Sequence, residues 1–220
     1  KNDLVKFLKI RPEKIDVVYH GINKQIFNQD KAQTNLLLKI KSPYAFYIGR
    51  LESKKNIVNL VKGFEIASQK NSSLSLVLSG KWGYGHQEIK QTINQLNPSI
   101  KEKIIITGYI SDEEYLNLLK NATVFCLTTN FEGFGMPVLE AMACGIPVIC
   151  SNIASLPEIC NDSALLINPQ KPEEIAIALL KISLNPVARD QLINKGLKNV
   201  KRFSWEESAR KTLNILKNVY

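Results

Sequence analysis

The sequence predicts an α/β domain in which a parallel β-sheet is covered by helices on both faces. Short apolar runs alternate with amphipathic stretches along the chain, and most of the apolar runs are followed directly by glycine or a small polar residue. The chain has 220 residues, of which 45% are hydrophobic, so it is long enough for one sizeable domain with a buried core. The alternating order predicts a doubly wound sheet with its ligand crevice at the carboxyl ends of the strands.

Seven apolar runs are the expected strands. They span residues 15–19, 45–48, 74–78, 103–107, 123–127, 148–150 and 164–167. Helices are expected in the intervals between them. In one such interval, Ile57, Leu60, Val61 and Phe64 recur at helical spacing. No internal repeat or low-complexity stretch interrupts this Rossmann-like order.

Two helix starts carry the spacing of a capping box. Ser111 is followed three residues later by Glu114, and Ser204 in the same way by Glu207. In the helix that follows the second of these, one face collects apolar side chains, namely Trp205, Ala209, Leu213 and Leu216. We expect this face to pack against another part of the protein rather than to bind a cofactor.

The net charge of +9 favours an anionic partner, which a nucleoside diphosphate, a membrane surface or a nucleic acid would each satisfy. The lysines are spread along the chain, and neither zinc-finger spacing nor an aromatic ribonucleoprotein motif is present, so nucleic acid is the weaker interpretation. No apolar stretch approaches the ~20 residues of a membrane span, and no signal peptide opens the sequence. We expect a cytoplasmic protein, with peripheral contact to the inner face of the plasma membrane as an alternative.

The cysteines show no CxxC spacing and mostly lie in apolar or small-residue contexts; they are Cys126, Cys144, Cys150 and Cys160. Buried, reduced thiols are the expected state. The chain has two histidines, His20 and His86, which are far apart in the sequence. We predict no metal site and no cofactor.

The segment 132–140, EGFGMPVLE, predicts a phosphate-binding helix start. The strand expected at 123–127 leads through a turn into a helix whose first residues are Met136 and Pro137, and proline suits a first helical position. Gly133 and Gly135 let the backbone bend and leave room for a ligand. The free N–H groups and the positive dipole end of such a helix form a cradle for a diphosphate.

Glu132 precedes this helix and Glu140 lies about one turn inside it, so the two carboxylates face different parts of one ligand. Ionised carboxylates accept strong hydrogen bonds from sugar and ribose hydroxyls. On the spacing alone, a helix start with a surface glutamate at either end is about as well supported.

The stretch 132–148, with FGMP, EAMA and CGIPV in this order, closely resembles the signature of the family 4 glycosyltransferases, also called group 1. These are retaining enzymes of the GT-B fold, in which two Rossmann-like domains face each other across a cleft. The resemblance begins at about Lys14 and implies that the chain is the C-terminal, donor-binding half. It implies transfer of a hexosyl group, usually from GDP- or UDP-hexose, with retention of the anomeric configuration.

The resemblance also suggests domain limits. Residues 1–13 are expected to be the tail of the acceptor domain or an interdomain crossover, residues 14–202 the nucleotide-sugar-binding domain, and residues 203–220 a C-terminal crossover helix. The chain is then an excised domain or a fragment, inactive by itself without the acceptor domain.

A second motif lies between the strand expected at 45–48 and the helix that follows, where Arg50 and Lys55 stand five residues apart. Arginine offers a planar fork and lysine a point charge, and together they suit a diphosphate. A solvated basic loop is the plain alternative. The resemblance implies that these cations stabilise the leaving diphosphate in place of a metal. Lys54 fits the register of the motif less well.

The resemblance assigns Arg50, Lys55 and Glu132 to catalysis, with Glu132 at the hydroxyls of the transferred sugar and Glu140 at the ribose. No separate general base is visible, which fits a mechanism in which the leaving phosphate takes the acceptor's proton. Further donor contacts are expected at Gly21, Gly49, Gly80, Tyr109, Ile110, Gly133, Phe134, Gly135, Met136, Pro137 and Val138. Among these, Gly21 is expected in a tight turn facing the cleft, and the backbone of Tyr109 and Ile110 beside the nucleobase. The glycine-rich segment 82–85 is expected to be a flexible rim.

Two alternatives of other classes stay open. One is a nucleotide-binding module without catalysis, and the other is a basic Rossmann-like domain that binds nucleic acid or a dinucleotide. Intact Arg50, Lys55, Glu132 and Glu140 argue against the first. The shared motifs do not fix the base and sugar of the donor, nor do they choose among glycan, lipid-linked and small-molecule acceptors, although polysaccharide or lipopolysaccharide biosynthesis is a common setting for the family.

Overall fold

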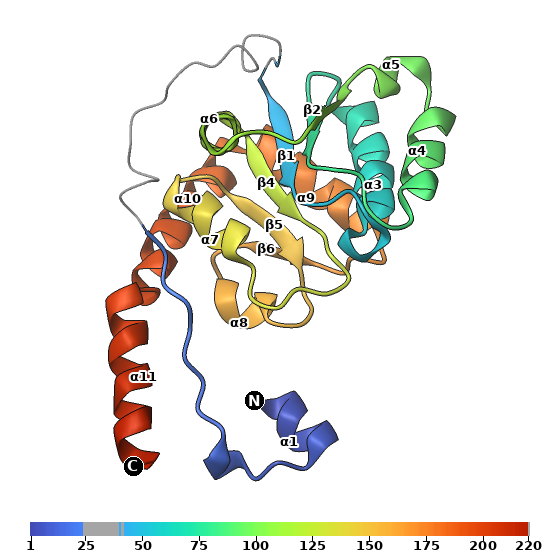
Figure 1. Cartoon of the computed structure of the whole chain (residues 1–220). Helices are drawn as coiled ribbons and strands as arrows, with labels where there is room; N and C mark the ends of the chain where they lie inside the picture. Colours follow the sequence, from blue (N-terminus) through green and yellow to red (C-terminus); the bar gives the residue numbers. More distant parts are fainter. Residues whose placement is uncertain (24–39, 41, 220) are drawn as a thin grey trace.

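The computed structural model describes residues 1–23, 40 and 42–219, which form an α/β domain around one six-stranded sheet (Figure 1). All strand pairs are parallel. The strands are β1 (Tyr44–Ile48), β2 (Ser75–Ser79), β3 (Ile104–Gly108), β4 (Val124–Leu127), β5 (Val148–Ser151) and β6 (Leu165–Ile167). Six of the expected strands are therefore confirmed.

The strand expected at 15–19 was wrong. This segment belongs to no strand, and most of its residues are half-buried or exposed, with Val17 50% exposed. Its β-branched residues favour an extended backbone, yet within the described part of the chain no sheet edge pairs with it. Its end is fixed instead by the ring of Tyr19, which packs against Phe134 and Phe203.

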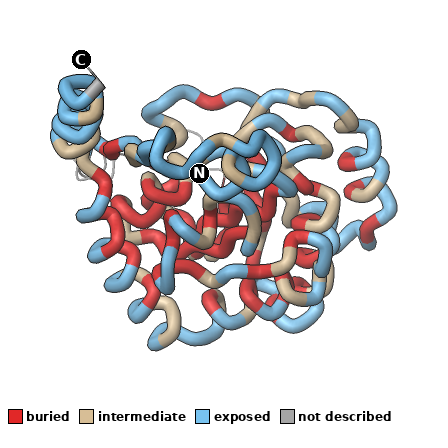
Figure 2. Tube along the Cα trace, turned by 90° about the horizontal axis from the view of Figure 1, so that it is seen from below, coloured by how far each residue is buried: buried red, intermediate tan, exposed pale blue. Residues whose placement is uncertain are grey.

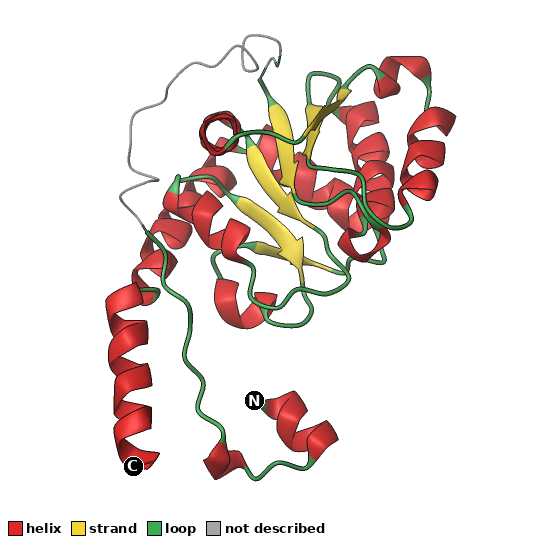
Figure 3. Ribbon diagram, viewed as in Figure 1, coloured by secondary structure: helices red, strands yellow, loops and turns green. Residues whose placement is uncertain are grey.

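Helices fill the intervals between the strands and extend beyond them on both sides (Figure 3). The α-helices are α1 (Asn2–Leu8), α3 (Ile57–Lys70), α4 (His86–Gln95), α5 (Pro98–Lys101), α6 (Asp112–Asn121), α7 (Met136–Ala143), α8 (Leu156–Cys160), α9 (Pro172–Leu184), α10 (Pro186–Asn199) and α11 (Trp205–Val219). Short 3₁₀ turns lie at η1 (Pro12–Lys14), η3 (Ser53–Lys55) and η4 (Val200–Arg202).

The helices form two layers. Helix α3 packs against α9 on one face of the sheet, while α6 and α7 cover the other face, where they contact β1 and β4 (Figure 1). Because both faces are covered, the strands are nearly continuous apolar runs rather than alternating ones, and β1 reads YAFYI with four of its five residues buried. The buried residues concentrate in this central layer (Figure 2).

The strand order is β3-β2-β1-β4-β5-β6, so the direction in which strands are added reverses between β1 and β4. This is the order of a doubly wound dinucleotide-binding sheet, as the sequence predicts. The loops that follow β1 and β4 diverge at this point, because their helices cover opposite faces. In such sheets, ligands bind in the crevice between those two loops.

The capping box predicted from the sequence is complete at the start of α6 and only half formed at the start of α11. The Oγ of Ser111 accepts from the N–H of Glu114 at 3.2 Å, and the Glu114 carboxylate accepts from the N–H of Ser111 at 2.9 Å. At α11 the Oγ of Ser204 accepts from the N–H of Glu207 at 3.3 Å, but the Glu207 carboxylate binds Arg210 at 2.8 Å. The ion pair with Arg210 therefore replaces the second half of that box.

Three of the four cysteines are fully buried, as expected, and Cys144 is half-buried. All four are free thiols, and the sulfur atoms of Cys150 and Cys160 lie 3.4 Å apart. Burial raises the pKa of Cys126 and of Cys144 to about 12, so both are neutral thiols at physiological pH. None of the helices in residues 1–23, 40 and 42–219 has both the length and the apolarity needed to cross a membrane.

Candidate functional site

The loop after β1 begins with a close approach of two backbones. Gly49 has φ 145° and Gly80 has φ 139°, both outside the range that most side chains adopt. A Cβ on Gly80 would lie 1.9 Å from the carbonyl oxygen of Gly49. The N–H of Gly49 donates to Ser79 O at 3.0 Å, and that of Gly80 donates to Gly108 O at 2.7 Å. The carboxyl ends of β1, β2 and β3 are thus linked to one another.

Asn56 fixes the far end of the same loop. Its backbone is left-handed, with φ 55°, and ends the turn η3 directly before α3. The buried side chain donates from Nδ2 to Thr128 O at 2.9 Å and to Pro169 O at 2.7 Å. Asn56 therefore ties the loop after β1 to the end of β4, and it sets the position of Lys55 beside it.

Lys55 and Glu132 meet across the crevice. The Nζ of Lys55 lies 2.9 Å from Oε2 of Glu132, and the two side chains are 22% and 18% exposed. Lys54 turns away and lies over the ring of Phe131, with Nζ 5.2 Å from its centroid. Arg50 is 71% exposed, and its Nε lies 3.9 Å from the Glu52 carboxylate. The structure thus brings two of the three expected catalytic residues into contact and leaves Arg50 open to solvent on the same loop.

The start of α7 has the geometry expected of an anion-binding helix end. Gly135 is its N-cap, with φ 96°, and no side chain caps it. Its first residues are Met136 and Pro137, as predicted. A Cβ on Gly133 would meet no atom within 4 Å, so the space in front of this turn is open among the described residues. The uncapped first turn leaves N–H groups available to an anion.

Val138 differs from the other expected donor residues at this helix start. Its side chain is fully buried, and its N–H already donates to Gly135 O at 3.0 Å. Val138 therefore packs the helix onto the core.

Glu140 lies on the first turns of α7, and its carboxylate Oε2 accepts a hydrogen bond from Oη of Tyr115 on α6. Burial raises the pKa of Glu140, the hydrogen bond from Tyr115 lowers it, and the charge of Asp112 raises it again. Burial also raises the pKa of Tyr115 well above its ordinary value, and the Glu140 charge adds to this. The phenol therefore stays protonated and donates. Sequence reasoning missed Tyr115, because nothing local to residue 115 signals a partner in another helix.

An aromatic cluster supports Phe134 from both ends of the chain, and sequence reasoning did not anticipate it. The ring of Phe134 lies 4.8 Å from that of His20 and 6.0 Å from that of Phe203, measured between centroids. The His20 ring lies 5.8 Å from that of Trp205. A Cβ on Gly21 would lie 2.1 Å from the backbone nitrogen of Trp205, so this glycine is explained by its close approach to the start of α11.

Tyr109 and Ile110 directly follow β3, the strand at one edge of the sheet. Tyr109 is 72% exposed and its ring lies under Lys81 Nζ, at 5.0 Å, whereas Ile110 is buried. The side chain of Tyr109 is thus presented to solvent, and that of Ile110 faces the core.

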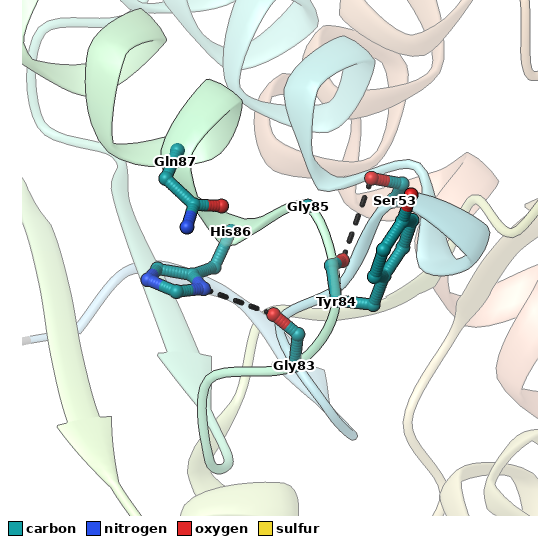
Figure 4. A pocket seen from close by; sticks show the side chains of 6 residues that line it. All are labelled: Ser53, Gly83, Tyr84, Gly85, His86 and Gln87. Atoms are coloured by element: carbon teal, nitrogen blue, oxygen red, sulfur yellow. Dashed lines mark hydrogen bonds between the residues drawn. The ribbon is translucent and has the colours of Figure 1, made fainter.

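A cavity of about 520 Å³ lies between η3 and the glycine-rich segment (Figure 4). It is lined by Ser53, Gly83, Tyr84, Gly85, His86 and Gln87. The Nδ1 of His86 lies 3.0 Å from Gly83 O, and the Oγ of Ser53 donates to Tyr84 O at 3.4 Å. None of the expected site residues lines this cavity. At Ser53 it adjoins the loop that carries Arg50 and Lys55, residues 49–56, which we call the cationic loop. In the described ranges, no three His, Cys, Asp or Glu side chains are grouped so as to hold a metal ion.

Comparison with known proteins identifies the family of the chain. Residues 28–199 match the family model of the glycosyl transferases group 1. The O-antigen chain mannosyltransferase B of Escherichia coli is 34% identical over 175 residues, which cover 79% of this chain and 45% of that protein. The chain therefore spans about half the length of this curated relative.

Solved structures share the fold. The C-terminal domain of a group 1 family glycosyl transferase from Francisella tularensis matches with a TM-score of 0.71 and 21% identity, over 83% of this chain and 97% of that one. HepE from Anabaena, solved in complex with UDP and glucose, matches with a TM-score of 0.80 and 19% identity, over 94% of this chain and 58% of that one. The chain belongs to the group 1 glycosyl transferases and corresponds to the C-terminal domain of their GT-B fold.

Proposed function

We propose that this chain binds the nucleoside diphosphate sugar of a retaining hexosyltransferase. The observation that carries the proposal is the contact of Lys55 with Glu132 at the point where the strand order reverses, beside the uncapped start of α7. A cation, a carboxylate and a helix N-terminus at this crevice suit the diphosphate and the sugar hydroxyls of one donor.

The proposed chemistry rests on positive charge. Arg50 and Lys55, with the α7 N-terminus, stabilise the diphosphate as it leaves the anomeric carbon. Glu132 accepts from hydroxyls of the transferred sugar and Glu140 from those of the ribose. The leaving phosphate takes the acceptor's proton, so no separate base is required.

Mannosyl transfer is the first specificity to test, since the 34% identical relative is named as an O-antigen chain mannosyltransferase. UDP-hexose is the second, because a protein of the same fold binds UDP. We propose a glycan or lipid-linked acceptor in polysaccharide or lipopolysaccharide biosynthesis, bound by an N-terminal domain. A lipid-linked acceptor would place the enzyme at the cytoplasmic face of a membrane.

We further propose that residues 14–202 are the donor domain and that α11 crosses to the acceptor domain. In support, Trp205, Leu213 and Leu216 on α11 are each 51–52% exposed, and α1 exposes Phe7 and Leu8. Apolar faces of this kind are expected to pack against another domain.

The test is a calorimetric titration of this chain with UDP, GDP and ADP, repeated for the best ligand on Arg50→Ala and Glu140→Ala. Selective binding of one nucleotide, weakened at least about tenfold by each change, supports the proposal. Lys54→Ala is the matched control, because its side chain lies over Phe131, and it is expected to bind within about twofold of the wild type. Failure of both this chain and the full-length protein to bind any of the three nucleotides contradicts the proposal.

A further inference from the structure

Tyr115 lies behind the carboxylate that is proposed to bind the ribose. It belongs to the first turns of α6, whereas Glu140 belongs to α7, and 25 residues separate them. The phenol donates to Oε2 of Glu140. The residues that the structure describes give the other oxygen, Oε1, no hydrogen bond.

The position of the phenol is fixed by its surroundings. The capping box of Ser111 and Glu114 sets the start of α6, directly before Tyr115. The ring also packs near Phe46 of β1, with 6.3 Å between centroids, and it has few rotatable bonds to lose. The Tyr115 hydroxyl, which donates the hydrogen bond, is therefore prearranged and needs no reordering when a ligand arrives.

Glu140 is a carboxylate in a partly buried site, where an ionised group is unfavourable without hydrogen bonds. The bond from Tyr115 opposes the effect of burial on the pKa of Glu140 and so favours the ionised form, and it occupies one of the two carboxylate oxygens, Oε2. Because the carboxylate is planar, fixing Oε2 by this hydrogen bond also fixes the direction of Oε1. A carboxylate held in this way is prearranged to accept hydrogen bonds from two ribose hydroxyls.

We propose that Tyr115 is a positioning residue, which orients the Glu140 carboxylate so that its free oxygen accepts hydrogen bonds from the ribose diol of the donor nucleotide. The inference rests on the proposed function of this site. Tyr115 acts through Glu140 and does not touch the ligand.

The test compares ribose recognition with simple binding. UDP and GDP and their 2′,3′-dideoxy counterparts are titrated into this chain as wild type, Tyr115→Phe, Glu140→Gln and the double variant. The wild type is expected to prefer the ribonucleotide by at least about tenfold. Tyr115→Phe is expected to reduce this preference at least about fivefold while affinity for the dideoxy compound stays within about twofold, and the double variant to match Glu140→Gln.

Tyr44→Phe is the matched control. Tyr44 lies on β1 and its hydroxyl donates to Leu118 O on the same helix α6 at 2.7 Å, so this variant also loses a buried phenol hydrogen bond. It is expected to lower the unfolding temperature and to leave the preference for the ribonucleotide unchanged.

The two hypotheses fail in different ways. If Tyr115→Phe keeps the full preference while Glu140→Gln loses it, the role of Tyr115 is overturned and the proposed function stands. If Tyr115→Phe and Glu140→Gln reduce the preference additively in the double variant, Tyr115 does not act through Glu140 and the inference is overturned. If the wild type binds the ribonucleotide and its dideoxy counterpart alike, or if neither this chain nor the full-length protein binds a nucleotide, the proposed function of Glu140 falls and the role of Tyr115 with it.

Discussion

Lys55 Nζ and Glu132 Oε2 lie 2.9 Å apart although 77 residues separate them in the sequence. The two side chains come from the loops after β1 and β4, which start side by side because these two strands pair at the point where the strand order reverses. Each is about one-fifth exposed, so the pair is partly desolvated. The contact means that the proposed sugar-binding carboxylate holds the proposed phosphate-binding cation in position.

We predict that this pair stabilises the fold. Lys55→Ala leaves the Glu132 carboxylate partly buried without its cation, and the free energy of unfolding is expected to fall by about 1–2 kcal/mol. Glu132→Gln keeps a hydrogen-bond acceptor and is expected to cost less. Urea unfolding of both variants and of the double variant measures the coupling; a double variant whose loss equals the sum of the single losses would show that the pair contributes nothing.

In the full-length enzyme, turnover is predicted to depend on the same loop. Arg50→Ala and Lys55→Ala are expected to lower kcat at least about a hundredfold, since each removes positive charge from the leaving diphosphate. Arg50 is largely exposed, so its replacement is expected to change stability by no more than about 0.5 kcal/mol. Lys54→Ala serves as the control with nearly wild-type turnover. Wild-type kcat in both Arg50→Ala and Lys55→Ala would rule out their catalytic role.

The fold was predictable because the four central strands, β1, β2, β4 and β5, are buried on both faces. Such strands appear in the sequence as short apolar runs, and six of the seven expected runs became strands. The run at 15–19 is also apolar apart from Asp16, but it has no strand beside it in the described structure, and composition carries no information on pairing. Helix starts were predictable where the signal is local, as at Ser111 and at Met136.

The site was predictable only as far as its motifs are local. The segment 132–140 and the cationic loop can be recognised in the sequence by the spacing of their residues. The residues that hold them in place cannot be recognised in this way. Asn56 bonds to a carbonyl 113 residues away, and Tyr115 to a carboxylate 25 residues away. Such contacts depend on which strands become neighbours, and so the residues that position Lys55 and Glu140 became visible only in the structure.

The close approach of Gly49, which follows β1, and Gly80, which follows β2, predicts that Gly80 tolerates no side chain. In Gly80→Ala, the added Cβ would meet the Gly49 carbonyl, and φ 139° is strained for alanine, so we expect a loss of at least about 2 kcal/mol of unfolding free energy. Gly133→Ala is the matched control, because its Cβ would meet open space and stability should change by no more than about 0.5 kcal/mol. Thermal unfolding separates the two; equal unfolding temperatures would contradict the clash.

Glu140 predicts a pH dependence of both stability and binding. Burial raises its pKa above the ordinary value of 4.5 despite the opposing bond from Tyr115, and the nearby charge of Asp112 acts in the same direction as burial. Because the folded state then binds the proton more tightly than the unfolded state, this group's contribution to stability is full below pH 4.5 and is lost as pH rises through the folded pKa. Compared with Glu140→Gln, the wild type should therefore lose unfolding free energy as pH rises from about 4.5.

Nucleotide binding should change in the opposite direction, since the ionised carboxylate is the better acceptor for ribose hydroxyls. Affinity for the preferred nucleoside diphosphate is expected to increase through the same pH range in the wild type and to be flatter in Glu140→Gln. Titrations at several pH values measure this directly. Identical pH profiles for the two proteins would show that Glu140 does not titrate in this range or does not face the ligand.

Asn56 provides the sharpest test of how the cationic loop is positioned, because its backbone and its side chain can be tested separately. Asn56→Gly keeps the left-handed backbone at φ 55° and removes the two hydrogen bonds, and we expect a loss of about 2 kcal/mol in unfolding free energy. Asn56→Ala adds the strain of a left-handed alanine, about 1 kcal/mol more. Asn56→Asp sets a carboxylate against Thr128 O and Pro169 O and should be the least stable of the three.

The functional consequence of these changes follows from the neighbouring residue. If Asn56 positions Lys55, nucleoside diphosphate affinity should fall in Asn56→Gly even at temperatures where that variant is fully folded, and adding Lys55→Ala should then weaken binding no further. Asn59→Ala is the matched control: Asn59 donates to the same Pro169 O at 3.0 Å but lies inside α3, one turn from the loop. Wild-type affinity in folded Asn56→Gly would mean that the two carbonyl contacts stabilise the domain without setting the position of Lys55.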